Sequence, residues 1–149
     1  FEATNRHIDA SDVKRVYDLF NGHTFYIQKT FNESFADTRE GEVCTLDTIR
    51  TAINNIIASN DTIFREILSN IPEKQKELLY AIAKDGKAEQ ITSAEFIKRH
   101  RLTSASSVQS ATKKLLEKDI ITERNKIYSL NDKLFAMWIN KLYGNTTML

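Results

Sequence analysis

The sequence contains little cysteine, proline or glycine, and each shortage excludes a class of protein. Its 149 residues include one cysteine, one proline and four glycines. Cys44 has no second cysteine to pair with, so a disulfide scaffold is excluded. The low glycine and proline content excludes a collagen-like chain, and the 41% of hydrophobic residues excludes a disordered one. No run reaches the roughly 18 apolar residues that a membrane helix needs. We therefore expect a cytoplasmic protein without a membrane partner.

Charged residues are plentiful, at 28%, but they are divided unevenly about Pro72. Residues 1–71 contain 7 basic and 11 acidic side chains, a net charge of −4, whereas residues 72–149 contain 14 and 9, a net charge of +5. We therefore predict a first domain over residues 1–71 and a second over residues 72–149. Only the second has the charge to approach a polyanion such as DNA.

Hydrophobic periodicity over residues 1–71 predicts four helices and no strand. Apolar residues recur every three or four positions in each segment, with Ser11, Thr45 and Asp61 placed to cap three of the helices. Asn21–Gly22 supplies backbone that can adopt positive φ between the first two helices. The apolar stripes must be buried against one another, so we expect a lid-type four-helix bundle. The phenylalanines of the second helix are expected in its core: Phe25, Phe31 and Phe35.

The pattern over residues 72–149 has the element order of a winged helix-turn-helix with a small β-hairpin. Ser93 and Asp132 are placed to cap helices, and Trp138 falls on the buried face of the last helix. The fold class predicted for the whole chain is therefore mainly α. The expected elements are a helix over 73–84, a helix over 93–100, a turn over 101–104, a helix over 105–118, strands over 120–122 and 127–130 around a four-residue polar loop, and a helix from 132.

In a winged helix-turn-helix, the outward face of the third helix can enter the major groove of DNA. Serine, glutamine and lysine on that face can bond base edges or phosphates, and the turn over Lys98–Arg101 and the wing add backbone contacts. The same face could also be the solvated side of a winged helix that packs only on protein. DNA and a protein partner are therefore both candidate partners. The candidate DNA-binding residues are Arg101, Ser106, Gln109, Ser110, Lys113, Lys114, Arg124 and Lys126.

No motif for catalysis or metal binding is present. The three histidines lack metal-ligand spacing, and Cys44 has no second cysteine to join them. Gly86–Lys87 is followed by Ala88, where a phosphate-binding loop has serine or threonine. We therefore expect this chain to have no catalytic residues, no metal and no cofactor of its own, and not to act as an enzyme alone.

Residues 20–28, Phe-Asn-Gly-His-Thr-Phe-Tyr-Ile-Gln, resemble the lid of bacterial and archaeal AAA-type (STAND-like) ATPases. Residues 102–109, 115–121 and 128–139 resemble the winged helix that follows the lid in that family. The resemblance covers most of the chain. It implies that the chain is a C-terminal piece of a longer ATPase, which agrees with a sequence that begins at Phe1 rather than methionine.

The resemblance also implies a partner and a ligand for the parent protein. The partner is the N-terminal nucleotide-binding core of the same chain, which would hold ATP and Mg²⁺. The loop Gly22-His23-Thr24 is then expected over the adenine, with Thr24 where the family usually has proline. The alternative is a free-standing winged-helix transcription regulator whose N-terminal helices form a dimerisation or sensing unit.

Overall fold

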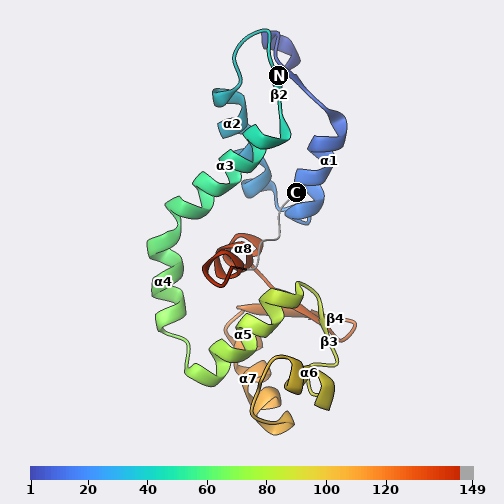
Figure 1. Cartoon of the computed structure of the whole chain (residues 1–149), viewed down its shortest axis with the longest axis vertical. Coiled ribbons are helices and arrows are strands. Elements are labelled where there is room, and N and C mark those ends of the chain that lie inside the picture. Colours follow the sequence, from blue (N-terminus) through green and yellow to red (C-terminus); the bar gives the residue numbers. More distant parts are fainter. Residues whose placement is uncertain (145–149) are drawn as a thin grey trace. The chain divides into compact units, whose positions relative to one another are not determined.

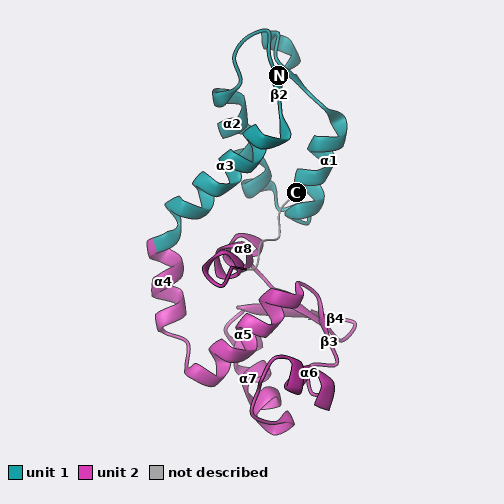
Figure 2. Ribbon diagram, viewed as in Figure 1, with its two compact units in different colours: residues 1–61, 147–149 teal, residues 62–146 magenta. Residues whose placement is uncertain are grey.

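The computed structural model describes residues 1–144, which form two compact units that divide between Asp61 and Thr62 (Figure 2). The protein is mainly helical, with a small antiparallel sheet in the second unit, as predicted (Figure 1). The division falls one helix earlier than Pro72, because helix α4 (Asp61–Ser69) groups with the second unit. None of the helices within residues 1–144 is long and apolar enough to cross a membrane.

Over residues 1–61, the first unit holds three α-helices and one short parallel strand pair. Strand β1 pairs with β2, His7 opposite Val43 and Ile8 opposite Cys44. The expectation of no strand in this part of the chain is therefore wrong, because strands of two residues are too short to show an alternating pattern. The elements are a 3₁₀ turn (Glu2–Thr4), β1 (His7–Ile8), α1 (Ala10–Leu19), α2 (Thr24–Asp37), β2 (Val43–Cys44) and α3 (Leu46–Ser59).

Helix α2 packs against α3, which buries five aliphatic side chains between Ile49 and Ile57. The fully buried residues of α2 are the small Thr30 and Ser34, not the phenylalanines. The inward face of α2 therefore carries small polar side chains. The predicted phenylalanine core is wrong: Phe25 is 61% exposed, and Phe31 and Phe35 are only half-buried.

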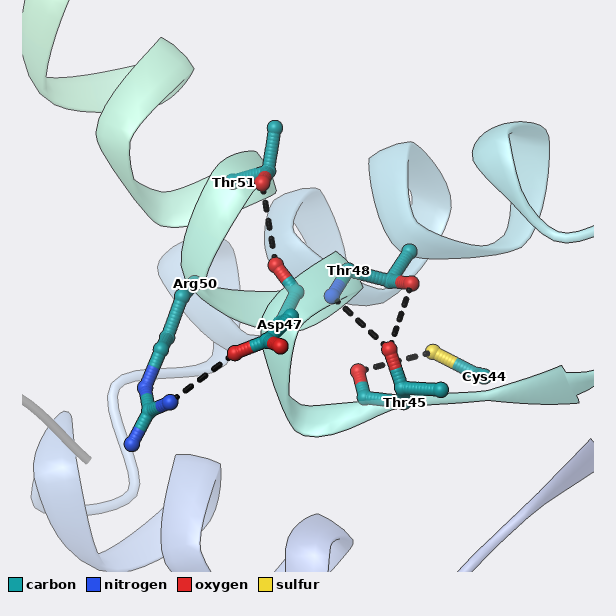
Figure 3. Close-up of polar contacts among 6 residues, drawn as sticks. All are labelled: Cys44, Thr45, Asp47, Thr48, Arg50 and Thr51. Atoms are coloured by element: carbon teal, nitrogen blue, oxygen red, sulfur yellow. Dashed lines mark hydrogen bonds and ion pairs between the residues drawn. The ribbon is translucent and has the colours of Figure 1, made fainter.

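Side-chain caps fix where the helices of the first unit begin. The cap of α1 is Asp9, not Ser11 as expected, because the Asp9 carboxylate accepts a hydrogen bond from the Ser11 backbone N–H at 2.7 Å. Hydrogen bonds from Ser11 hold the pKa of Asp9 below its ordinary value. The predicted cap of α3 is confirmed: Thr45 Oγ1 accepts from the Thr48 N–H at 3.2 Å (Figure 3).

The second unit has the predicted order of a winged helix-turn-helix. Ser93 and Asp132 cap their helices as expected, and Trp138 is buried. The extra strand β3 was not predicted; it pairs with β5 to give an antiparallel sheet of order β3-β5-β4. After α4 the elements are α5 (Glu73–Asp85), β3 (Ala88–Glu89), α6 (Ala94–Arg99), α7 (Ala105–Glu117), β4 (Ile121–Arg124), β5 (Ile127–Leu130) and α8 (Lys133–Leu142).

Helix α4 contributes to the core of the second unit through one aromatic side chain. The Phe64 ring lies 5.1 Å from the ring of Phe135 and 5.7 Å from that of Trp138. These distances are typical of favourable aromatic pairs. The three rings hold α4 on α8, which explains why the second unit begins before α5.

Candidate functional site

Helix α7 exposes five of the eight side chains that the sequence indicated for DNA contact. Its inward face buries Val108, Ala111, Thr112 and Leu115 against the second unit. A step of about 100° per residue then turns the polar residues between them outward. Ser106, Gln109, Ser110, Lys113 and Lys114 are all exposed.

Four of the candidate cations are exposed and have no ion-pair partner in the part of the chain that the structure describes. They are Arg101, Lys113, Arg124 and Lys126. Lys114 differs, because its Nζ lies 3.1 Å from a carboxylate oxygen of Glu117. A cation already held by a carboxylate has less to gain from a phosphate. The four unpaired cations are therefore the stronger candidates.

The two residues before Arg101, Arg99 and His100, already contact a carboxylate of the protein. A carboxylate oxygen of Asp85 lies 2.6 Å from Arg99 Nη2, and its other oxygen lies 3.0 Å from His100 Nε2. The His100 side chain is only 6% exposed and packs on the Phe96 ring. The expectation that His100 contacts a DNA backbone is therefore wrong, because its ring is enclosed. Arg101 stays accessible, at a left-handed φ of 55° in the turn before α7.

The wing is the hairpin of β4 and β5, and its turn is tighter than expected. Strand β4 continues to Arg124, which pairs with Ile127, so the loop has two residues rather than four. Asn125 and Lys126 both have positive φ, 52° and 61°. Two-residue hairpin turns favour this conformation because it matches the twist of the strands. The turn brings Arg124 and Lys126 to the tip of the wing.

A cleft of about 960 Å³, which we call the wing cleft, lies between α7, the segment 89–92 and the wing. Three of the eight DNA candidates line it: Gln109, Lys113 and Lys126. The other five lie outside its lining. Sequence reasoning missed Glu89 and Tyr128, which also line it, because only the pairing of β3 with β5 brings residue 89 beside the wing.

In the first unit, the loop Gly22-His23-Thr24 is surrounded by aromatic side chains. Gly22 has a φ of 75°, and a Cβ atom placed there would lie 3.0 Å from Tyr17 Oη. The His23 ring stacks on Tyr26 at 4.9 Å, and the Phe25 ring meets Tyr26 at 5.5 Å. We call Tyr17, Gly22, His23, Phe25 and Tyr26 the lid face.

The lid face is apolar and open. Tyr17 is 58% exposed and Phe25 61% exposed, which is unusual for aromatic residues. His23 and Thr24 are exposed as well, and the His23 side chain does not cap α2. Of these aromatic residues Phe25 was expected in the core, so the sequence predicted the loop but not the exposed aromatic surface around it.

Outside the two regions above, the cysteine and the possible metal ligands among residues 1–144 do not form a metal site. Cys44 is a buried free thiol, and burial raises its pKa. Among residues 1–144, no three His, Cys, Asp or Glu side chains come together in a way that could hold a metal ion.

The second unit thus has the fold and exposed helix of a winged-helix protein, and comparison with protein families agrees. The model of the family described as "Probable winged helix domain" matches residues 62–141, more than half of the chain. The chain belongs to this family. The match begins where the second unit begins, at Thr62. No curated protein and no solved structure matches the chain.

Proposed function

We propose that the chain is the lid and winged-helix arm of a AAA-type ATPase, and that it has no catalytic activity of its own. The observation that carries the proposal is the lid face. It combines the loop that resembles the family's lid with two aromatic side chains that are more than half exposed, Tyr17 and Phe25.

The physical argument is that exposed aromatic side chains beside a polar loop suit a purine nucleotide. Tyr17 and Phe25 would stack on or border the base, since aromatic faces favour such contacts. The polar start of α2 at His23 and Thr24 would face the sugar or phosphate. In this role the arm senses a nucleotide that the parent's core holds with Mg²⁺, and it transmits that state to the winged helix.

The proposal is tested on the protein encoded by the full reading frame that contains this chain. Tyr17→Ala and Phe25→Ala should each weaken MgATP binding by roughly fivefold or more, because stacking of a base on an aromatic ring contributes about 1 to 3 kcal/mol. Val43→Ala is the matched control, since Val43 is an exposed apolar residue of the same unit outside the lid face. Equal affinities in all three variants would remove the lid face from the nucleotide site.

A second measurement concerns the 149-residue chain alone. It should not hydrolyse ATP, because the sequence has no phosphate-binding loop. ATP hydrolysis that a point substitution in the purified chain abolishes would contradict the assignment. The alternative, a free-standing winged-helix regulator, predicts neither an ATP-binding core upstream nor any effect of the lid face on nucleotide affinity.

Contact with duplex DNA is the second candidate function of the winged helix. The favouring observation is the set of four exposed cations without ion-pair partners in the described chain: Arg101, Lys113, Arg124 and Lys126. Each phosphate contact that they make would release condensed counterions, so binding should weaken steeply with salt. Without a dimer or a partner that fixes register, binding by one copy should be weak.

A further inference from the structure

The wing cleft has a floor suited to side chains rather than to a sugar–phosphate backbone. Ile91 and Thr112 at the cleft are buried, and Leu116, Ile127 and Tyr128 are half-buried. The Thr112 hydroxyl is already used, because it donates to the Val108 carbonyl at 2.7 Å. The floor therefore presents mainly apolar surface. A volume of about 960 Å³ lies in the range of sites that enclose a compact ligand or several side chains.

The rim of the wing cleft is acidic, although the second half of the chain is basic. Three carboxylates line it, Glu89, Glu117 and Glu123, against the two ammonium groups of Lys113 and Lys126. Its formal charge is therefore −1. A phosphate backbone in the cleft would meet three carboxylates as well as the two ammonium groups, whereas a cation would gain from the net negative charge.

The carboxylates are placed to receive a cation from outside. Glu89 has no ion pair within the described residues, whereas Glu117 already pairs with Lys114 through an exposed contact of 3.1 Å, so a cation from outside would compete with Lys114 there. One oxygen of Glu123 accepts the Lys126 backbone N–H at 3.0 Å, which orients the carboxylate and leaves its second oxygen for another donor. Such groups match the planar donors of a guanidinium or an ammonium.

We propose that the wing cleft binds a short segment of a partner protein in which a lysine or arginine stands beside an aliphatic or aromatic side chain. The apolar side chain fills the floor between α7 and β5, and the cation meets the carboxylates of the rim. This inference goes beyond the function proposed above. It rests on the winged helix alone, so it stands whether or not an ATPase core precedes the chain.

The test uses the purified 149-residue chain and a phage-displayed library of random peptides. Enriched peptides should pair Lys or Arg with a neighbouring apolar residue. Glu117→Lys and Glu123→Lys should each weaken the binding of a synthetic enriched peptide by about two- to fivefold, and the double variant by roughly tenfold, as for exposed charge pairs. Glu66→Lys on α4 makes the same charge change outside the cleft and should leave the affinity unchanged.

Three results would overturn the proposal. One is no enrichment, or enrichment of acidic or uncharged peptides. Another is an enriched peptide whose affinity is the same for Glu117→Lys, Glu123→Lys and Glu66→Lys. The third is displacement of the peptide by a short duplex DNA that binds the wild-type chain more tightly than the peptide does. The cleft would then be a nucleic-acid site. Thermal unfolding of each variant checks that a lost affinity does not come from a lost fold.

Discussion

Replacing Phe64 by alanine tests whether α4 is part of the winged-helix unit. Phe64 is 3% exposed and lies against Phe135 and Trp138 of α8. Truncation of a buried phenylalanine costs about 3 to 5 kcal/mol, through lost burial and the cavity that remains. In a domain of 60 to 100 residues each kcal/mol lowers Tm by roughly 4 to 8 °C. We therefore expect Phe64→Ala to lower the Tm of the second unit by more than about 12 °C.

The fluorescence of Trp138 gives a direct assay, because it is the only tryptophan in the sequence and lies in this core. The control is Ile63→Ala on the same helix, since Ile63 is 55% exposed and its truncation should change stability by no more than about 0.5 kcal/mol. If the two variants unfold at the same temperature, α4 does not belong to the winged-helix core and the second unit begins at α5.

Other predictions concern the DNA candidates, the wing turn and the buried thiol. Lys113→Glu and Arg124→Glu should each weaken binding of a labelled duplex and lower the salt slope by about 0.9 per lost phosphate contact; unchanged anisotropy titrations in both variants would discard the groove assignment. Lys126→Gly should raise the free energy of unfolding by about 0.5 to 1 kcal/mol, and with it Tm, because glycine adopts the positive φ of 61° without strain. A lower Tm would contradict the turn geometry. Burial raises the pKa of Cys44, so its thiolate forms at lower pH in the unfolded chain than in the folded one. The difference in free energy of unfolding between the wild type and Cys44→Ala should therefore shift against the wild type above about pH 9. If urea unfolding gives the same difference from about pH 8 to about pH 10, the thiol is not buried.

Sequence periodicity predicted the long elements well because their apolar stripes are regular. Helices α5 and α7 lie within a few residues of their expected ranges, and the wing hairpin was predicted from its two apolar strands. The predicted caps Thr45, Ser93 and Asp132 are confirmed. Each stands just before an apolar helical segment, where its side chain accepts a hydrogen bond from a backbone N–H of the first helical turn.

The errors arise where tertiary contacts decide the outcome. Strands β1 and β3 have two residues each and exist only because a distant strand pairs with them. Helix α2 buries Thr30 and Ser34 and exposes Phe25, a rotation that hydrophobicity alone would reverse. The exposure of Phe25 on the lid face follows from that rotation, so this part of the aromatic surface could not be predicted from the sequence.

Five of the eight candidate DNA residues lie on the exposed face of α7, as the helical periodicity predicted, yet the acidic character of the surface between α7 and the wing was not predicted. The charge balance of the second half is +5, but the wing cleft gathers Glu89, Glu117 and Glu123 from three separate elements. Net charge along a sequence does not determine the local charge of a surface that the fold assembles.

Determining the reading frame upstream of Phe1 distinguishes an ATPase arm from a free-standing winged-helix protein. An arm of a AAA-type ATPase requires a glycine-rich loop ending in Lys-Ser or Lys-Thr roughly 200 residues upstream, because that loop holds the phosphates of the nucleotide. We expect that loop to be present. A start codon immediately before Phe1 would instead identify a free-standing winged-helix protein.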